Sequence, residues 1–167
     1  MRAQRERDFR AVADEATPAI GAYIRRRIYP LSHSDADDLI EEVLIIAWRR
    51  LDDIPPGAAV PWLIGVARNV LRNAHRKYRR GQVVTSQLAP PHHDSSAEDN
   101  VIADEGVRTA LAMLSDDDRE IVLLHAWDGR SSEEIGVIFG ITSNAAAVRL
   151  SRAQDRFRKN FTAIAVG

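Results

Sequence analysis

The clearest structural signal in the chain lies at residues 131–157, which have the sequence SSEEIGVIFGITSNAAAVRLSRAQDRF. Ser131 and Glu134 have the spacing of a capping box, in which each side chain bonds a backbone N–H at the start of a helix. Gly140 can adopt the left-handed conformation that ends such a helix. Two short helices joined by a glycine-containing turn predict a helix-turn-helix, whose second helix would lie in the major groove of DNA.

The second helix of this motif, expected at residues 143–160, has an apolar side and a polar side. Thr142 or Ser143 can cap it. At about 100° per residue, its core-facing side carries Ala146, Leu150, Ala153 and Phe157. The outward side and its flanks hold the candidate DNA contacts, which are Ser143, Asn144, Ala147, Val148, Arg149, Ser151, Arg152 and Arg156. The Arg152 guanidinium can bond a guanine, or a phosphate, at two points. An ordinary amphipathic helix with a charged face is the alternative.

A second basic element lies at residues 68–80, which contain no acid. Its cations are Arg68, Arg72, Arg76, Lys77, Arg79 and Arg80, and its amide and aromatic groups are Asn69, Asn73, His75 and Tyr78. Such a helix suits a nucleic-acid strand, because the cations follow the phosphates while the other groups hold bases. The chain therefore has two candidate nucleic-acid surfaces.

The net charge of −1 hides this local distribution. Residues 1–80 hold 15 Arg or Lys against 11 acids, whereas residues 81–107 hold five acids and no Arg or Lys. Residues 108–167 hold eight of each sign, with five cations crowded at their end. Local positive charge, rather than the total, drives contact with phosphate.

Composition narrows the class of protein further. The 167 residues fit one ordinary domain or two small ones. The absence of cysteine excludes a disulfide framework and a thiolate zinc site. The charged N-terminus leads into no long apolar run, so we expect no signal peptide, no membrane contact and a cytoplasmic location.

Strand signals are almost absent and a 3.6-residue period recurs, so the expected fold is all-α. Helices are expected at residues 5–29, 35–51, 60–80, 102–114, 116–127, 131–139 and 143–160. Ser34 should cap the second helix, and Pro18 fits a first-turn position. We expect two small helical domains, 1–80 and 102–167, joined by a flexible acidic linker at 81–101.

The predicted helix at 35–51 has an unusual outward face. Its inward side carries Leu39, Ile40, Val43, Leu44, Ile46 and Ala47. On the opposite side Ile45 lies among acids, with Trp48 at the margin. Apolar groups framed by acids indicate a protein-docking patch. The alternatives are a solvated face with one stray isoleucine, or a patch covered by the first helix.

Four segments, taken in order, resemble the motifs of one family. They are DADDLIEEVLIIAW at 35–48, PWLIGVARNVL at 61–71, LSDDDREIVLL at 114–124 and the stretch from Glu134 to Ala153. They resemble regions 2.2, 2.3–2.4, 4.1 and 4.2 of bacterial sigma factors of the extracytoplasmic-function type, group IV of the sigma-70 family. The resemblance covers nearly the whole chain. It implies a protein that directs core RNA polymerase to promoter DNA without a cofactor or metal ion.

The resemblance implies a role for each surface. Docking on the β′ clamp helices of the polymerase would involve Asp38, Glu41, Glu42, Ile45, Trp48 and Arg49, and the second domain would contact the β flap. The loop at 52–59 and the basic helix would open and hold the −10 element, through Trp62, Arg68, Asn69, Arg72, Asn73, Arg76, Lys77, Arg79 and Arg80. The helix at 143–159 would read the −35 duplex.

Two further expectations come from the resemblance. Residues 81–100 would pass near the polymerase active-site cleft and the RNA exit path, where their acidic charge either imitates RNA or belongs to a plain linker. Many family members are held inactive by an anti-sigma factor, so such a partner is expected here.

The chain departs from the family pattern at four positions. Glu41 replaces a frequent Gln and Leu44 a common Phe, which leaves docking plausible. Ala147 replaces a frequent Lys or Arg, and Val148 a common Ser, which removes polar groups from the groove-facing region. The −35 sequence can therefore differ from the commonest one or depend more on DNA shape and phosphates, and Val148 can contact a thymine methyl group.

Two other classes of protein compete with this interpretation. A stand-alone helix-turn-helix regulator would explain residues 108–160 but not 35–80. A metalloenzyme could use His33, Asp35, Asp37 and Asp38, or His92, His93 and Asp94, as ligands. The first set lies at a helix start, where acids favour the dipole. The second lies in the expected linker, which cannot preorganise a site.

Overall fold

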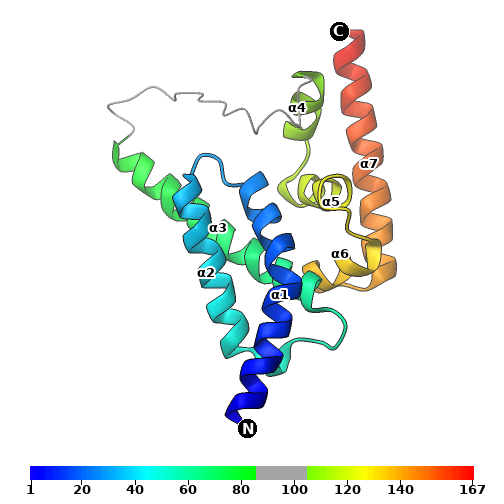
Figure 1. The fold of residues 1–167 in the computed structure, drawn as a ribbon. Helices are drawn as coiled ribbons and strands as arrows, with labels where there is room; N and C mark the ends of the chain where they lie inside the picture. The colour runs from blue at the N-terminus through cyan, green and yellow to red at the C-terminus, as the bar shows by residue number, and fades with distance from the viewer. Residues whose placement is uncertain (86–104) are drawn as a thin grey trace. The chain divides into compact units, whose positions relative to one another are not determined.

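The computed structural model describes residues 1–85 and 105–167, which form helices and turns without a β-strand in either range (Figure 1). The chain divides into two compact units, residues 1–92 and 93–167. This confirms the expected all-α class with two helical bodies. In the described residues no helix is long and apolar enough to cross a bilayer.

The first unit is a bundle of three long helices, α1 (Arg2–Arg26), α2 (His33–Arg49) and α3 (Ala59–Thr85), each packed on the other two. A short 3₁₀ turn, η1 (Leu51–Asp53), begins the loop between α2 and α3. The core is built from side chains with almost no exposed surface, among them Ile20, Tyr23, Ile24, Val43, Leu63 and Ile64. Their burial on all three helices makes one continuous apolar interior, which holds the exposed faces in place.

The start of α2 differs from the prediction, because Ser32 and not Ser34 caps it. The Ser32 hydroxyl accepts a hydrogen bond from the Asp35 backbone N–H at 3.1 Å, and an Asp35 carboxylate oxygen accepts one from the Ser32 N–H at 2.8 Å. Aspartate replaces the usual glutamate of a capping box. The hydrogen bonds from the Ser32 backbone and side chain lower the pKa of Asp35. Asp35 therefore has a structural role in place of a metal-binding one.

Two other helix boundaries were predicted wrongly. Pro18 lies inside α1 and not in a first turn, since α1 runs unbroken from Arg2 to Arg26. Its missing N–H removes one helical hydrogen bond, and burial of the flanking Ala16 and Ile20 against the bundle offsets the loss. The helix α3 continues past residue 80 to Thr85, so the first residues of the expected linker are helical. The rest of that linker, at 86–101, lies outside the described residues.

The second unit contains α4 (Glu105–Ala112), α5 (Asp116–Ala126), α6 (Ser132–Phe139) and α7 (Ser143–Val166). The long α7 packs against each of the other three. The core of the second unit includes Ile121, Leu124, Ile135, Ala146 and Ala153, all at most 1% exposed. The predicted end of α7 at residue 160 was too early, since the helix continues to Val166; along it, Phe157 and the exposed Phe161 stack with ring centroids 6.1 Å apart.

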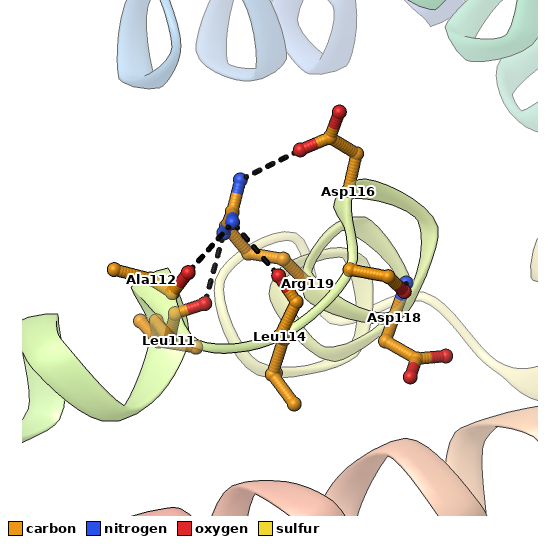
Figure 2. Close-up of polar contacts among 7 residues, drawn as sticks. Leu111, Ala112, Leu114, Asp116, Asp118 and Arg119 are labelled. Atoms are coloured by element: carbon orange, nitrogen blue, oxygen red, sulfur yellow. Dashed lines mark hydrogen bonds and ion pairs between the residues drawn. The ribbon is translucent and has the colours of Figure 1, made fainter.

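The corner between α4 and α5 is held by Arg119 (Figure 2). Its guanidinium donates hydrogen bonds to the carbonyl oxygens of Leu111, Ala112 and Leu114 at 3.0, 3.3 and 3.0 Å, and pairs with the Asp116 carboxylate at 3.2 Å. The last carbonyls of a helix have no intrahelical partner. One side chain of α5 thus satisfies the end of α4 and fixes the angle between the two helices.

Candidate nucleic-acid and protein-binding surfaces

The helix-turn-helix is formed by α6 and α7, and its local geometry matches the prediction. Ser131 and Glu134 form the capping box, with both hydrogen bonds at 3.2 Å. Gly140 ends α6 with φ 67° and ψ 34°. A Cβ atom on Gly136 would lie 2.8 Å from the carbonyl oxygen of Ile141. The close approach of the turn to α6 therefore requires a glycine at 136, which the sequence pattern alone did not indicate.

The outward side of α7 presents all eight predicted DNA contacts. Each of them is exposed: Ser143, Asn144, Ala147, Val148, Arg149, Ser151, Arg152 and Arg156. The opposite side is buried through Ala146, Leu150 and Ala153, while Phe157 is half-buried against the cluster of Leu111, Leu114 and Leu123. Thr142, one of the two expected caps, accepts a hydrogen bond from the Ala145 N–H at 3.1 Å. The predicted division of the helix is confirmed.

The three candidate arginines on α7 differ in their surroundings. Arg156 donates to a carboxylate oxygen of Asp118, on α5, at 2.7 Å. In the described part of the chain, neither Arg149 nor Arg152 forms a hydrogen bond or an ion pair. Arg149 and Arg152 are therefore available to an outside ligand, whereas Arg156 is already bound within its own unit.

The predicted −10 surface follows α3, which contains no acid. Seven of its nine candidates are exposed: Asn69, Arg72, Asn73, Arg76, Lys77, Arg79 and Arg80. Trp62 and Arg68 are half-buried. The guanidinium of Arg50 lies 5.0 Å from the centroid of the Trp62 ring and bonds Asp53 at 3.0 Å. Arg50 was not among the predicted site residues, since nothing in the linear pattern pairs it with Trp62.

A groove of about 610 Å³ separates the acidic side of α2 from the basic side of α3. Its α2 wall includes Asp38 and Glu42, and its α3 wall includes Asn73, Arg76, Lys77 and Arg80. The sequence assigned these walls to two different partners. The structure brings them together, so that opposite charges face one another across a single opening and attract.

The outward patch of α2 is only partly as predicted. Ile45 is 51% exposed, and Asp38, Glu41, Glu42 and Arg49 are exposed around it. Trp48 is half-buried and makes an edge-on contact with Phe9, their centroids 5.3 Å apart, while Arg5 lies 5.4 Å from its ring. The first helix covers Trp48, at the margin of the patch, but not Ile45, so the alternative of a patch covered by the first helix holds for Trp48 alone.

His75 lies at the contact between α3 and the end of α1. Burial lowers the pKa of His75, the nearby charge of Arg79 lowers it further, and hydrogen bonding to the backbone of Ile28 and Arg27 opposes the shift. Its Nε2 atom is buried without a hydrogen-bond partner among the described residues. This ring therefore supports the bundle as a neutral group, and it belongs to the interior side of the basic helix.

The residues proposed as metal ligands do not form a metal site in the described part of the chain. Across residues 1–85 and 105–167, no three His, Cys, Asp or Glu side chains converge as metal ligands would. Asp37 pairs with Arg25 at 3.6 Å, and Asp35 belongs to the capping box. His92, His93 and Asp94 lie outside the described residues.

Comparison with known proteins places both units in one family. Residues 16–81 match Sigma-70 region 2, and residues 104–155 match Sigma-70 region 4. SigL of Mycobacterium tuberculosis, an ECF RNA polymerase sigma factor, is 30% identical over 154 residues, which cover 89% of this chain and 86% of SigL. RfaY of Xanthomonas campestris, a probable RNA polymerase sigma factor, is 30% identical over 132 residues, and the chain spans 33% of its length.

A similar solved structure supports the same family. The sigma factor RpoE, in complex with the anti-sigma factor NepR from Bartonella quintana, is 26% identical with a TM-score of 0.60, over 93% of this chain and 97% of that one. A stand-alone regulator would not account for region 2. The chain belongs to the extracytoplasmic-function group of the sigma-70 family of RNA polymerase sigma factors, which direct the polymerase to promoters.

Proposed function

We propose that α7 reads the −35 element of the promoter in duplex form. The observation that carries this proposal is the clean division of α7 between a buried apolar side and an exposed, mostly polar side. Arg149 and Arg152 carry no internal partner in the described residues, so their guanidinium groups can donate to base edges or phosphates. Val148 is 41% exposed and offers an apolar contact to a thymine methyl group.

The α3 surface and the loop before it hold the −10 element in this proposal. Base unstacking costs a few kcal/mol per step. Stacking on an aromatic ring returns about 1–3 kcal/mol per base, and the cations hold the phosphates of the separated strand. Trp62 is the candidate stacking ring, with Arg50 over it. Among the described residues few such contacts are available, so opening depends on a favourable −10 sequence.

Core polymerase docks on the exposed face of α2, around Ile45. An apolar side chain in a ring of charged groups matches the anatomy of a protein interface, in which a desolvated centre is surrounded by a polar rim. Trp48 contributes from beneath, by fixing α2 against α1 through Phe9 and Arg5. The clamp helices of the β′ subunit are the proposed partner of this face, and the β flap is the proposed partner of the second unit.

An anti-sigma factor is the proposed regulator. RpoE is described in complex with one, NepR. In this chain Ile45 and the charged groove between α2 and α3 lie on neighbouring faces of α2. A protein that covered both would block polymerase docking and shield the basic wall from DNA. The proposed location is the cytoplasm, where polymerase and promoter are found, and the proposed activity involves no catalysis or cofactor of its own.

The test is transcription with purified components. The full chain is added to core polymerase and a template whose start sites were mapped in cells that overproduce the protein. Specific transcripts from those starts, absent without the chain, support the proposal. Binding to DNA without any specific transcript would contradict it and restore the stand-alone regulator.

A further inference from the structure

The ion pair between Asp118 and Arg156 connects the predicted recognition helix to a different helix of its unit. The Arg156 guanidinium and the Asp118 carboxylate are 2.7 Å apart, with 57% and 19% of the side chains exposed. Asp118 belongs to the first turn of α5, where its backbone N–H also bonds the Ser115 hydroxyl at 3.2 Å. Asp118 is thus largely buried, and its position is fixed at the start of α5.

The start of α5 contacts both α4 and α7 through an arginine: Arg119 of α5 reaches α4, and Arg156 of α7 reaches α5. Figure 2 shows the carboxylates of Asp116 and Asp118 directed to opposite sides of this turn. Asp116 pairs with Arg119, which binds the end of α4, while Asp118 pairs with Arg156 of α7. Asn160, one turn further along α7, donates to the Ala110 carbonyl at 3.2 Å. The elements α4, α5 and α7 are therefore tied together by polar contacts at fixed points.

Arg156 lies four residues after Arg152, so the two side chains occupy nearly the same strip of the α7 surface, about 6 Å apart along the axis. A constraint on Arg156 fixes the rotation of that strip about the helix axis. Recognition of a base edge tolerates displacements of about 0.5 Å and rotations of about 10–20°. A contact that limits rotation of α7 can thus determine where the Arg152 guanidinium is presented.

We propose that Arg156 is a positioning residue for −35 recognition: its bond to Asp118 sets the rotation of α7, and Arg156 does not itself bind DNA. This inference rests on the proposed role of α7. It replaces the direct DNA contact that the sequence predicted for Arg156 with a contact inside the second unit.

The two roles make opposite predictions for Asp118→Asn. If Arg156 binds phosphate, this change removes a negative charge and frees the guanidinium, so it strengthens binding to any DNA. If Arg156 positions α7, the change weakens discrimination, as Arg156→Gln also does. The experiment compares holoenzyme made with each full-length variant on two templates that differ only in the −35 element. The ratio of the two occupancies cancels differences in the active fraction of protein.

We expect both single changes to lower this ratio about threefold, the range of an ion pair near the surface. The double variant Asp118→Asn with Arg156→Gln should lose no more than either single variant. The reversed pair, Asp118→Arg with Arg156→Asp, should recover most of the ratio. The salt dependence of binding should be unchanged in Arg156→Gln.

Stronger binding by Asp118→Asn, or a reduced salt slope in Arg156→Gln with equal losses on both templates, would overturn the inference. Arg152→Ala serves as the reference for the proposed function. If that variant also keeps the parental ratio, then α7 does not read the −35 element and the proposed function itself fails. If Arg152→Ala alone lowers the ratio, only the positioning role is wrong.

Discussion

The helices α3 and α7 both carry arginines along an exposed side, yet they hold these cations differently. The 27 residues of α3 contain no acid. In α7, Arg158 bonds Asp155 at 2.8 Å and Arg156 bonds Asp118 of α5. A continuous cationic side suits a flexible strand whose phosphates can adjust to it. A side with some cations held in place suits the fixed pattern of a duplex groove. We therefore expect DNA binding through α3 to depend mainly on salt concentration, and DNA binding through α7 to depend mainly on base sequence.

The largest effect is expected for Arg152→Ala. Loss of a bidentate contact to a base should weaken recognition of the −35 element by about 1–3 kcal/mol. Promoter binding by holoenzyme, measured on templates with and without that element, checks this. Arg158→Ala is the matched control, because it removes the same charge from α7 at a position paired with Asp155. Equal losses in the two variants would show that α7 contributes charge alone.

The complementary change on α3 is the triple substitution Arg72→Gln, Arg76→Gln and Lys77→Gln. Each lost contact to a single strand should reduce the slope of log affinity against log salt by about 0.7, or about 2 in total. Between 50 and 200 mM salt this corresponds to about a 16-fold smaller loss of affinity. Open-complex formation, followed by the reactivity of unpaired thymines, provides the measurement. An unchanged slope would place the −10 strand elsewhere.

A smaller effect is expected on the outward face of α2, which is proposed to bind core polymerase and not DNA. Ile45→Glu puts a charge at the centre of the proposed docking patch and should weaken core polymerase binding by about 1–2 kcal/mol. Trp48→Ala should instead destabilise the first unit, because it removes the packing on Phe9. Binding of each variant to core polymerase, together with its thermal unfolding, separates the two residues. If Ile45→Glu kept both its thermal stability and its affinity for core polymerase, the proposed docking site at Ile45 would be wrong.

The sequence predicted the features that depend on local chemistry. The capping box at Ser131 and Glu134, the left-handed Gly140 and the buried side of α7 follow from spacing alone, and all three are confirmed. Ser34 directly precedes the helix expected at residues 35–51 and was therefore the predicted cap, whereas α2 begins at His33 and places Ser34 inside its first turn. The hydrogen bonds show that Ser32 has the required spacing to Asp35.

Contacts between distant residues could not be predicted. Arg5 reaches Trp48 across 43 residues of sequence, and Arg156 reaches Asp118 across 38. A helical wheel describes one helix and contains no information on its neighbours. It therefore left Trp48 at the margin of the outward face and listed Arg156, on the flank of its helix, among the DNA contacts. The neighbouring helices α1 and α5 give each of these side chains a partner that the wheel does not contain.

The smallest effect is a dependence of stability on pH in the first unit, due to His75. Burial lowers its folded-state pKa, so the unfolded chain takes up a proton at a higher pH than the folded bundle does. Stability is therefore complete above the ordinary histidine value of about 6.5 and falls as pH decreases from there to the folded pKa. Amide hydrogen exchange in α1 and α3 of the full chain should accelerate over this range relative to His75→Gln, after correction for the intrinsic effect of pH. If the exchange rates of the parent chain and His75→Gln changed in parallel with pH, the proton would reach His75 without opening the bundle. The expected difference between α3, which contains this histidine, and α7, which contains none, would then disappear.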